Sequence, residues 1–206
     1  MPRPFFLLLP LLFAAPFAAA LAQTPAPAPA TTPAPPSATL PDARELTPAE
    51  RTAYLKSLAE ASALIKEQRY GEAIARLDAL LAQRPREPQA RFLRAIAIGG
   101  EGRTDEAMAA LSGLVADFPE LPEPWNNLAV MHAQKGNYES ARVALESAVR
   151  AAPGWPVAQE NLGDVHARLA AAAYDEALRA DPANKTAAAK LAAIRAMFPA
   201  AKPATQ

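Results

Sequence analysis

The chain has 206 residues, enough for one modest globular domain, with a formal net charge of +0, 22 prolines and no cysteine. Balanced charge argues against a general nucleic-acid-binding protein, which would carry a basic stripe, and the lack of cysteine excludes a disulfide framework. A hydrophobic fraction of 51% with 6% aromatic residues suits closely packed, alanine-rich helices.

Residues 1–22 have the pattern of a cleavable secretory signal. Arg3 lies beside the amino terminus, an apolar run follows, and the small residues Ala20 and Ala22 fit the positions that a signal peptidase reads. The alternative is an uncleaved membrane anchor, because the apolar run approaches spanning length, although two prolines interrupt it. We expect cleavage after Ala22, a periplasmic location and no membrane insertion after signal cleavage.

Residues 23–46 alternate proline and alanine, a composition that cannot build a core and favours an extended spacer. A ligand for a proline-reading domain is the competing interpretation. Residues 199–206 are predicted to be a disordered tail, which leaves 47–198 as the folded domain. Its first helix is predicted over 48–68, because Thr47 fits an N-cap, Pro48 the first helical position and Glu50 a capping box.

The folded domain has a 34-residue period. The unit 122–155 is the clearest, and shifts of 34 positions bring 88–121 and 54–87 into alignment with it. Its signature positions are Trp125, Leu128, Ala129, Gly136, Tyr138, Ala141, Leu145, Ala148 and Pro153. Gly102 and Gly136 suit a left-handed helix cap between the two helices of a unit.

This period and pattern resemble the tetratricopeptide repeat family, in which each unit is a pair of antiparallel helices. The resemblance implies an all-α fold, a right-handed solenoid of about three helix-turn-helix units. Residues 156–182 form a shortened fourth unit, and residues 184–198 a C-terminal capping helix.

The fourth unit lacks its turn. Ala129 and Ala148 are 19 positions apart, whereas the matching Gly163 and Ala177 are 14 apart, so five residues are missing. Four successive alanines occupy the place of the turn, and alanine is the best helix former. We therefore predict one fused helix over 156–180, about 37 Å long at 1.5 Å per residue.

Tyr174 and Leu178 in the second half of that helix require a cover. One candidate is the capping helix, in which Leu191, Ile194 and Phe198 follow a helical spacing. The other is a second copy of the chain, which would make this surface a homodimer contact.

No catalytic, cofactor or metal site is predicted. His132 and His166 occupy the same place in successive units, without accompanying carboxylates or cysteines, so we expect both to pack in buried or half-buried positions. The sequence has no glycine-rich phosphate loop after a strand and no nucleophile-base-acid set. The protein is accordingly interpreted as a non-enzyme.

The resemblance implies that the first helix of each unit lines a concave groove for a partner protein or peptide segment. The predicted groove residues are Gln89, Phe92, Ile96, Glu123, Asn126, Asn127, Val130, Gln134, Glu160, Asn161, Asp164 and Arg168. Asn127 and Asn161 match a backbone-binding asparagine ladder of related repeats, or else they bond local polar groups. The lysine and asparagine places of a carboxylate clamp hold Leu58 and Ser62, which argues against that mode.

The sequence thus favours a non-enzymatic periplasmic scaffold for protein–protein interaction. Envelope assembly, secretion or cell-wall processes are the expected settings, by analogy with exported repeat proteins. The alternative is a self-associating structural protein that dimerises through the helix 156–180.

Overall fold

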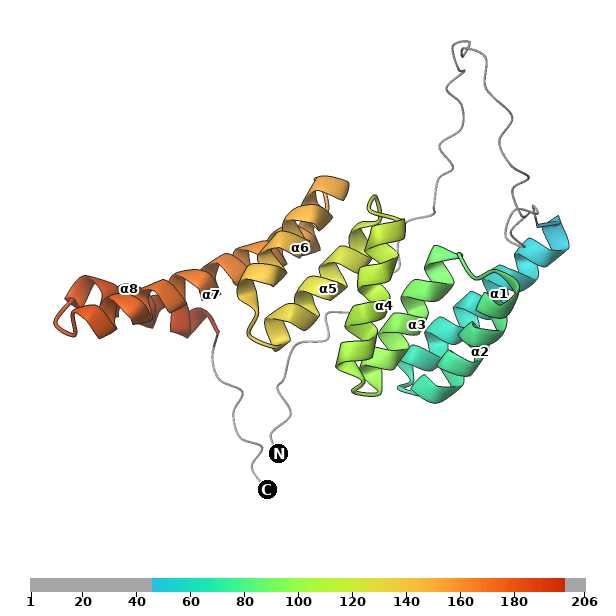
Figure 1. Ribbon diagram of the computed structural model, residues 1–206, viewed down its shortest axis with the longest axis horizontal. Helices are drawn as coiled ribbons and strands as arrows, with labels where there is room; N and C mark the ends of the chain where they lie inside the picture. The colour runs from blue at the N-terminus through green and yellow to red at the C-terminus, as the bar shows by residue number, and fades with distance from the viewer. Residues whose placement is uncertain (1–45, 199–206) are drawn as a thin grey trace, which may run out of the picture. The chain divides into compact units, whose positions relative to one another are not determined.

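The computed structural model describes residues 46–198, and its helices lie in one compact unit. In chain order they are α1 (Pro48–Lys66), α2 (Tyr70–Gln83), α3 (Pro88–Gly100), α4 (Thr104–Asp117), α5 (Pro122–Gln134), α6 (Tyr138–Ala151), α7 (Pro156–Ala180) and α8 (Lys185–Met197) (Figure 1). No strand occurs within 46–198, so the predicted all-α fold class is confirmed. The proposed signal, most of the spacer and the tail lie outside the described residues.

The first helix begins as its sequence predicts. The Thr47 hydroxyl accepts a hydrogen bond from the Glu50 backbone N–H at 3.3 Å, and the Glu50 carboxylate accepts one from the Thr47 N–H at 2.9 Å. This reciprocal capping box satisfies two backbone donors that the helix itself leaves unpaired. The helix ends at Lys66, two residues before the predicted end, because Gln68 already has a left-handed φ of 60° in the turn.

Three left-handed residues separate the paired helices at a constant spacing. Gln68, Gly102 and Gly136 have φ values of 60°, 83° and 77°, and each stands 34 positions after the one before. Glycine adopts this conformation without the steric cost that a side chain adds, which confirms the two predicted glycine caps. The next position in the series is Ala170, which lies inside α7.

The core repeats with the same period. Helix α1 packs with α2, α3 with α4, and α5 with α6, and each pair packs against the next. Small side chains where the paired helices meet are almost completely buried, which lets their backbones approach closely. They are Ala61, Ala95 and Ala129 on the first helices, and Ala73, Ala107 and Ala141 on the second. Leu77, Leu111 and Leu145 fill the space beside them.

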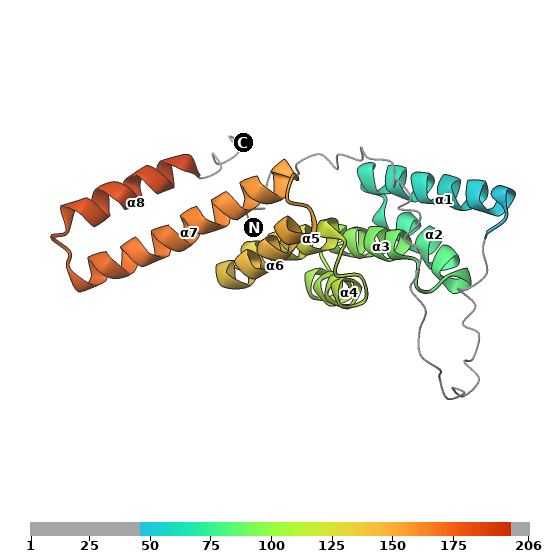
Figure 2. The same cartoon turned by 90° about the horizontal axis from the view of Figure 1, so that it is seen from above.

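Helix α7 is continuous over 25 residues, which confirms the predicted fused helix. Figure 2 shows α8 returning antiparallel to it, along the half of α7 that lies beyond α6. Leu191 is buried between these two helices, Lys190 Nζ lies 5.5 Å from the Tyr174 ring centroid, and Arg195 pairs with Asp175 at 3.0 Å. Helix α8 ends at Met197, so Phe198 lies just after it rather than inside it as predicted.

Candidate functional site: the first-helix face and the α6–α7 pocket

The predicted groove residues lie on three successive first helices, α3, α5 and α7. In Figure 2, α4 and α6 lie on one side of α3 and α5, whereas α1 and α7 lie on the other side. We call the surface that these residues of α3, α5 and α7 form the first-helix face. Its residues are Gln89, Phe92, Ile96, Glu123, Asn127, Val130, Gln134, Glu160, Asn161, Asp164 and Arg168.

The first-helix face combines half-buried apolar side chains with exposed polar ones. Phe92, Ile96 and Val130 are half-buried, so each side chain keeps part of its surface in solvent. Phe92 and Ile96 also pack on the core clusters beneath, which fixes their positions. The exposed members are Gln89, Glu123, Gln134, Glu160 and Asp164. The arrangement offers apolar contact surface and hydrogen-bonding groups to a ligand, without a reactive group.

Asn126 is buried beneath the first-helix face and bonds one of its residues. The side chain is 7% exposed, and its Oδ1 accepts a hydrogen bond from Asn161 Nδ2 of the next unit at 2.8 Å. A buried amide without a partner would cost free energy, so this bond joins α5 to α7 at a place where the core is polar. The prediction that Asn126 lines the groove is therefore wrong, because Asn161 and α7 cover it.

The two candidate rungs of the asparagine ladder have partners within the chain. Asn127 Nδ2 donates to the Glu123 carbonyl oxygen of its own helix at 2.9 Å, and Asn161 Nδ2 donates to Asn126. This is the local bonding that the sequence left open as the alternative.

Carboxylates dominate the α7 part of the first-helix face. Glu160, Asp164 and Arg168 follow one another at four-residue spacing, which places them on one side of the helix. Burial raises the pKa of the Asp164 carboxyl above its usual value, and the nearby charge of Glu160 raises it further, whereas Arg168 lowers it. This end of the face therefore disfavours an additional negative charge.

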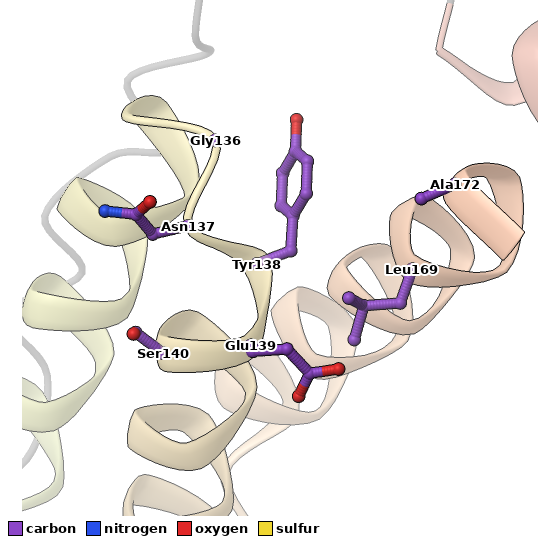
Figure 3. Close-up of a pocket in the computed structure, with 7 residues that line it drawn as sticks. All are labelled: Gly136, Asn137, Tyr138, Glu139, Ser140, Leu169 and Ala172. Carbon is purple, nitrogen blue, oxygen red and sulfur yellow. The ribbon is translucent and has the colours of Figure 1, made fainter. Parts of the chain in front are cut away.

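A second site, which the sequence interpretation missed, lies where α7 passes the beginning of α6. The α6–α7 pocket has a volume of about 390 Å³ (Figure 3). Its lining residues are Gly136, Asn137, Tyr138, Glu139, Ser140, Leu169 and Ala172. In the close-up, Leu169 and Ala172 of α7 stand across from Tyr138 and Glu139 of α6. Arg168 extends over the Tyr138 ring, with its Cζ 5.9 Å from the ring centroid.

The absence of a turn in the fourth unit creates that pocket. At the place where α5 breaks and the chain turns through Gly136 into α6, α7 continues as a helix through Ala170. Its next turn therefore stays beside the start of α6 and supplies one wall. The sequence indicates this wall, since the position 34 residues after Lys135 is held by the apolar Leu169.

The two histidines differ in their surroundings. His132 is half-buried, its Nδ1 is buried without a hydrogen-bond partner, and burial together with the charge of Lys135 lowers its pKa. His166 is exposed, so the expectation of packing is wrong for this residue. The reason is the missing turn of its unit, because the second half of α7 does not fold back to cover it. Among the described residues, no three metal-ligating side chains come together.

No helix within 46–198 is both long enough and apolar enough to cross a bilayer.

Comparisons with known proteins identify the family. Two family models described as tetratricopeptide repeat match residues 58–122 and 100–164, and together they span about half of the chain. A search of the curated proteins found no match.

Solved structures share the fold. The Sgt2 TPR domain from Aspergillus fumigatus aligns with a TM-score of 0.55 and 20% identity, covering 61% of this chain and 82% of that domain. The first TPR domain of human RPAP3 gives 0.53 and 19%, covering 57% and 92%. The first TPR of Spaghetti (RPAP3), in a complex with the HSP90 peptide SRMEEVD, gives 0.52 and 19%, covering 57% and 93%. With its repeats, its helical pairs and these matches, the chain belongs to the tetratricopeptide repeat family.

Proposed function

We propose that this protein is a non-enzymatic scaffold that binds a segment of another protein on the first-helix face. The observation that carries the proposal is the group of half-buried apolar side chains, Phe92, Ile96 and Val130, on first helices that also carry exposed polar side chains. Such a surface provides both apolar contact area and hydrogen bonds, as protein interfaces do. The RPAP3 repeat domain, which has a similar fold, is bound to a peptide, which supports this use of the fold.

The chemistry of the face argues for a ligand without clustered negative charge. Glu160 and Asp164 already repel each other, and an acidic peptide would add a third carboxylate beside them. The α1 positions that hold cationic and amide groups in a carboxylate clamp are Leu58 and Ser62, of which Leu58 is buried. We therefore expect basic segments with apolar anchors.

The test is a selection of random peptides on the full chain, followed by affinity measurements. The variant with Glu160→Lys and Asp164→Lys should weaken binding of the selected peptides at least ~10-fold, since each reversed charge opposes a basic ligand. Glu120→Lys, an exposed residue outside the first-helix face, is the matched control and should bind like the wild type. Equal binding by the double variant would remove this face as the site.

We further propose that the protein works after export, in the periplasm, in envelope assembly, secretion or cell-wall processes. The support is the signal-like pattern of residues 1–22 and the spacer-like composition of residues 23–46. Amino-terminal sequencing of the protein from a periplasmic fraction should begin at Gln23, and an uncleaved chain in the membrane fraction would reject the proposal.

Self-association through α7 has weaker support. Helix α8 of the same chain packs along the second half of α7, with Lys190 on Tyr174 and Arg195 on Asp175. Sedimentation of the full chain should therefore give a monomer. A dimer that Tyr174→Glu dissociates would favour the alternative.

A further inference from the structure

Successive repeat junctions bring the same two positions together. Asp105 at the start of α4 forms an ion pair with Lys135 at the end of α5. One repeat earlier, the matching residues are Gly71 and Glu101, and a side-chain carbon added at Gly71 would lie 3.5 Å from the Glu101 carboxylate. One repeat later, the matching residues are Glu139 and Leu169, and both line the α6–α7 pocket.

The junction between α6 and α7 keeps an acidic residue at the first position but has no basic residue at the second. Glu139 stands where Asp105 stood, but the place of Lys135 is taken by Leu169. The Glu139 carboxylate accepts instead from Arg142 Nε of its own helix at 2.9 Å, and Arg142 also donates to Glu146. Two carboxylates thus share one guanidinium, and the Glu139 side chain remains 69% exposed. This group of three carries one negative charge more than positive charges.

The same junction supplies an apolar wall that the earlier one cannot have. Because α7 does not turn, Leu169 and Ala172 follow each other along it beside the Tyr138 ring. A lysine side chain combines a four-carbon stem, which packs on apolar surface, with a charged end that remains near water and an acid. The pocket offers both surfaces within about 390 Å³.

We propose that the α6–α7 pocket binds a lysine side chain of a partner protein. Its stem lies along Leu169 and Ala172, and its ammonium group pairs with Glu139, as Lys135 pairs with Asp105 one repeat earlier. The site is separate from the first-helix face and does not depend on binding there. No covalent step is involved.

The test is a methyl NMR titration of the full chain with three short peptides that differ only in their central residue. The sequence is acetyl-Ala-Ala-X-Ala-Ala-amide, with X as lysine, norleucine or glutamate. The lysine peptide should shift the Leu169 and Ala172 methyl signals with millimolar affinity, as expected for one side chain. Norleucine, which keeps the stem without the charge, should bind several-fold more weakly, and glutamate should not shift these signals.

Two variants separate the chemistry from unspecific effects. Glu139→Gln should lower the affinity for the lysine peptide several-fold. Leu169→Lys, which is read on the Ala172 methyl signal, should abolish the shift because its own side chain supplies the cation. Asp105→Asn, at the junction that is already filled, is the matched control and should respond like the wild type. Circular dichroism of each variant verifies that the helices are intact.

Three results would overturn the proposal. They are equal affinity for the lysine and norleucine peptides, an unchanged affinity in a folded Glu139→Gln variant, and no shift of the Leu169 and Ala172 signals by any peptide. A dimer of the unliganded chain that Glu139→Gln dissociates would also overturn it, because the lysine would then come from a second copy. Peptide binding that changes only the first-helix face would leave the proposed function standing and remove this site.

Discussion

A single added methyl group at Gly100 tests how closely α2 and α3 pack. A side-chain carbon built there would overlap the Tyr70 ring, and Tyr70 is packed against the first core cluster. We expect Gly100→Ala to lower the free energy of unfolding by about 1–3 kcal/mol, as overpacking does. Urea denaturation followed by circular dichroism measures it.

Gly113→Ala is the matched control for that substitution. Gly113 is exposed inside α4, and the nearest atom to an added carbon would be Arg91 Nη2 at 3.8 Å. Alanine is the better helix former, so this variant should gain about 0.5–1 kcal/mol. Two losses of equal size would mean that the Tyr70 ring is not the cause.

Side-chain burial is the part of the site that the sequence predicts least well. Asn126 and Asn127 are neighbours of the same type, yet one is buried under Asn161 and the other bonds its own helix. Their position in the repeat places both near the first-helix face, but which of the two is buried depends on how closely α7 approaches. The burial of His166 is equally hard to predict, because its exposure follows from the turn that is missing further along α7.

The continuity of α7 is an element-scale property, and the exposed Ala173 is the place to test it. Ala173→Pro removes one backbone hydrogen bond and should cost about 3 kcal/mol, whereas Ala173→Gly at the same position should cost about 1 kcal/mol. The loss should be confined to the second half of α7 and to α8, because α8 packs there. Denaturation of both variants, followed by circular dichroism, gives the two values.

A uniform loss of helicity in Ala173→Pro would contradict that expectation. It would mean that the first three units depend on α8.

At this scale the sequence predicts helices well, because their ends carry local chemistry. Thr47 and Glu50 mark the beginning of α1 through their capping box. Gly102 and Gly136 mark the ends of α3 and α5, because glycine adopts the left-handed conformation of these turns without strain. The fused helix follows from the sequence alone, because the fourth unit lacks the five residues of a turn. The α6–α7 pocket does not, since it arises from two helices that pass each other at a distance that no local pattern records.

The whole repeat array should unfold from its carboxyl-terminal end. Helix α8 packs on α7, whereas α3 and α5 each contact helices on both sides. In a linear array each unit is stabilised by its neighbours, so the end with fewest contacts opens most readily. Hydrogen exchange should therefore be fastest in α8 and the second half of α7, and slowest in α3 to α6.

Removal of α8 by a stop after Pro182 provides the control. The shorter chain should exchange faster around Tyr174 and Leu178 and keep the slow amides of α3 to α6. Faster exchange throughout the array would contradict a purely neighbour-to-neighbour stabilisation.

The absent turn also sets an upper length for whatever the first-helix face holds. Ordinary units add a new first helix beside the last one, but α8 lies along the second half of α7 and adds nothing to that face. The three first helices of this face, at a spacing of about 10 Å, span about 20 Å. An extended chain covers about 3.3 Å per residue, so about six residues of a partner fill the face. Peptides lengthened beyond that number should gain no further affinity, whatever their sequence.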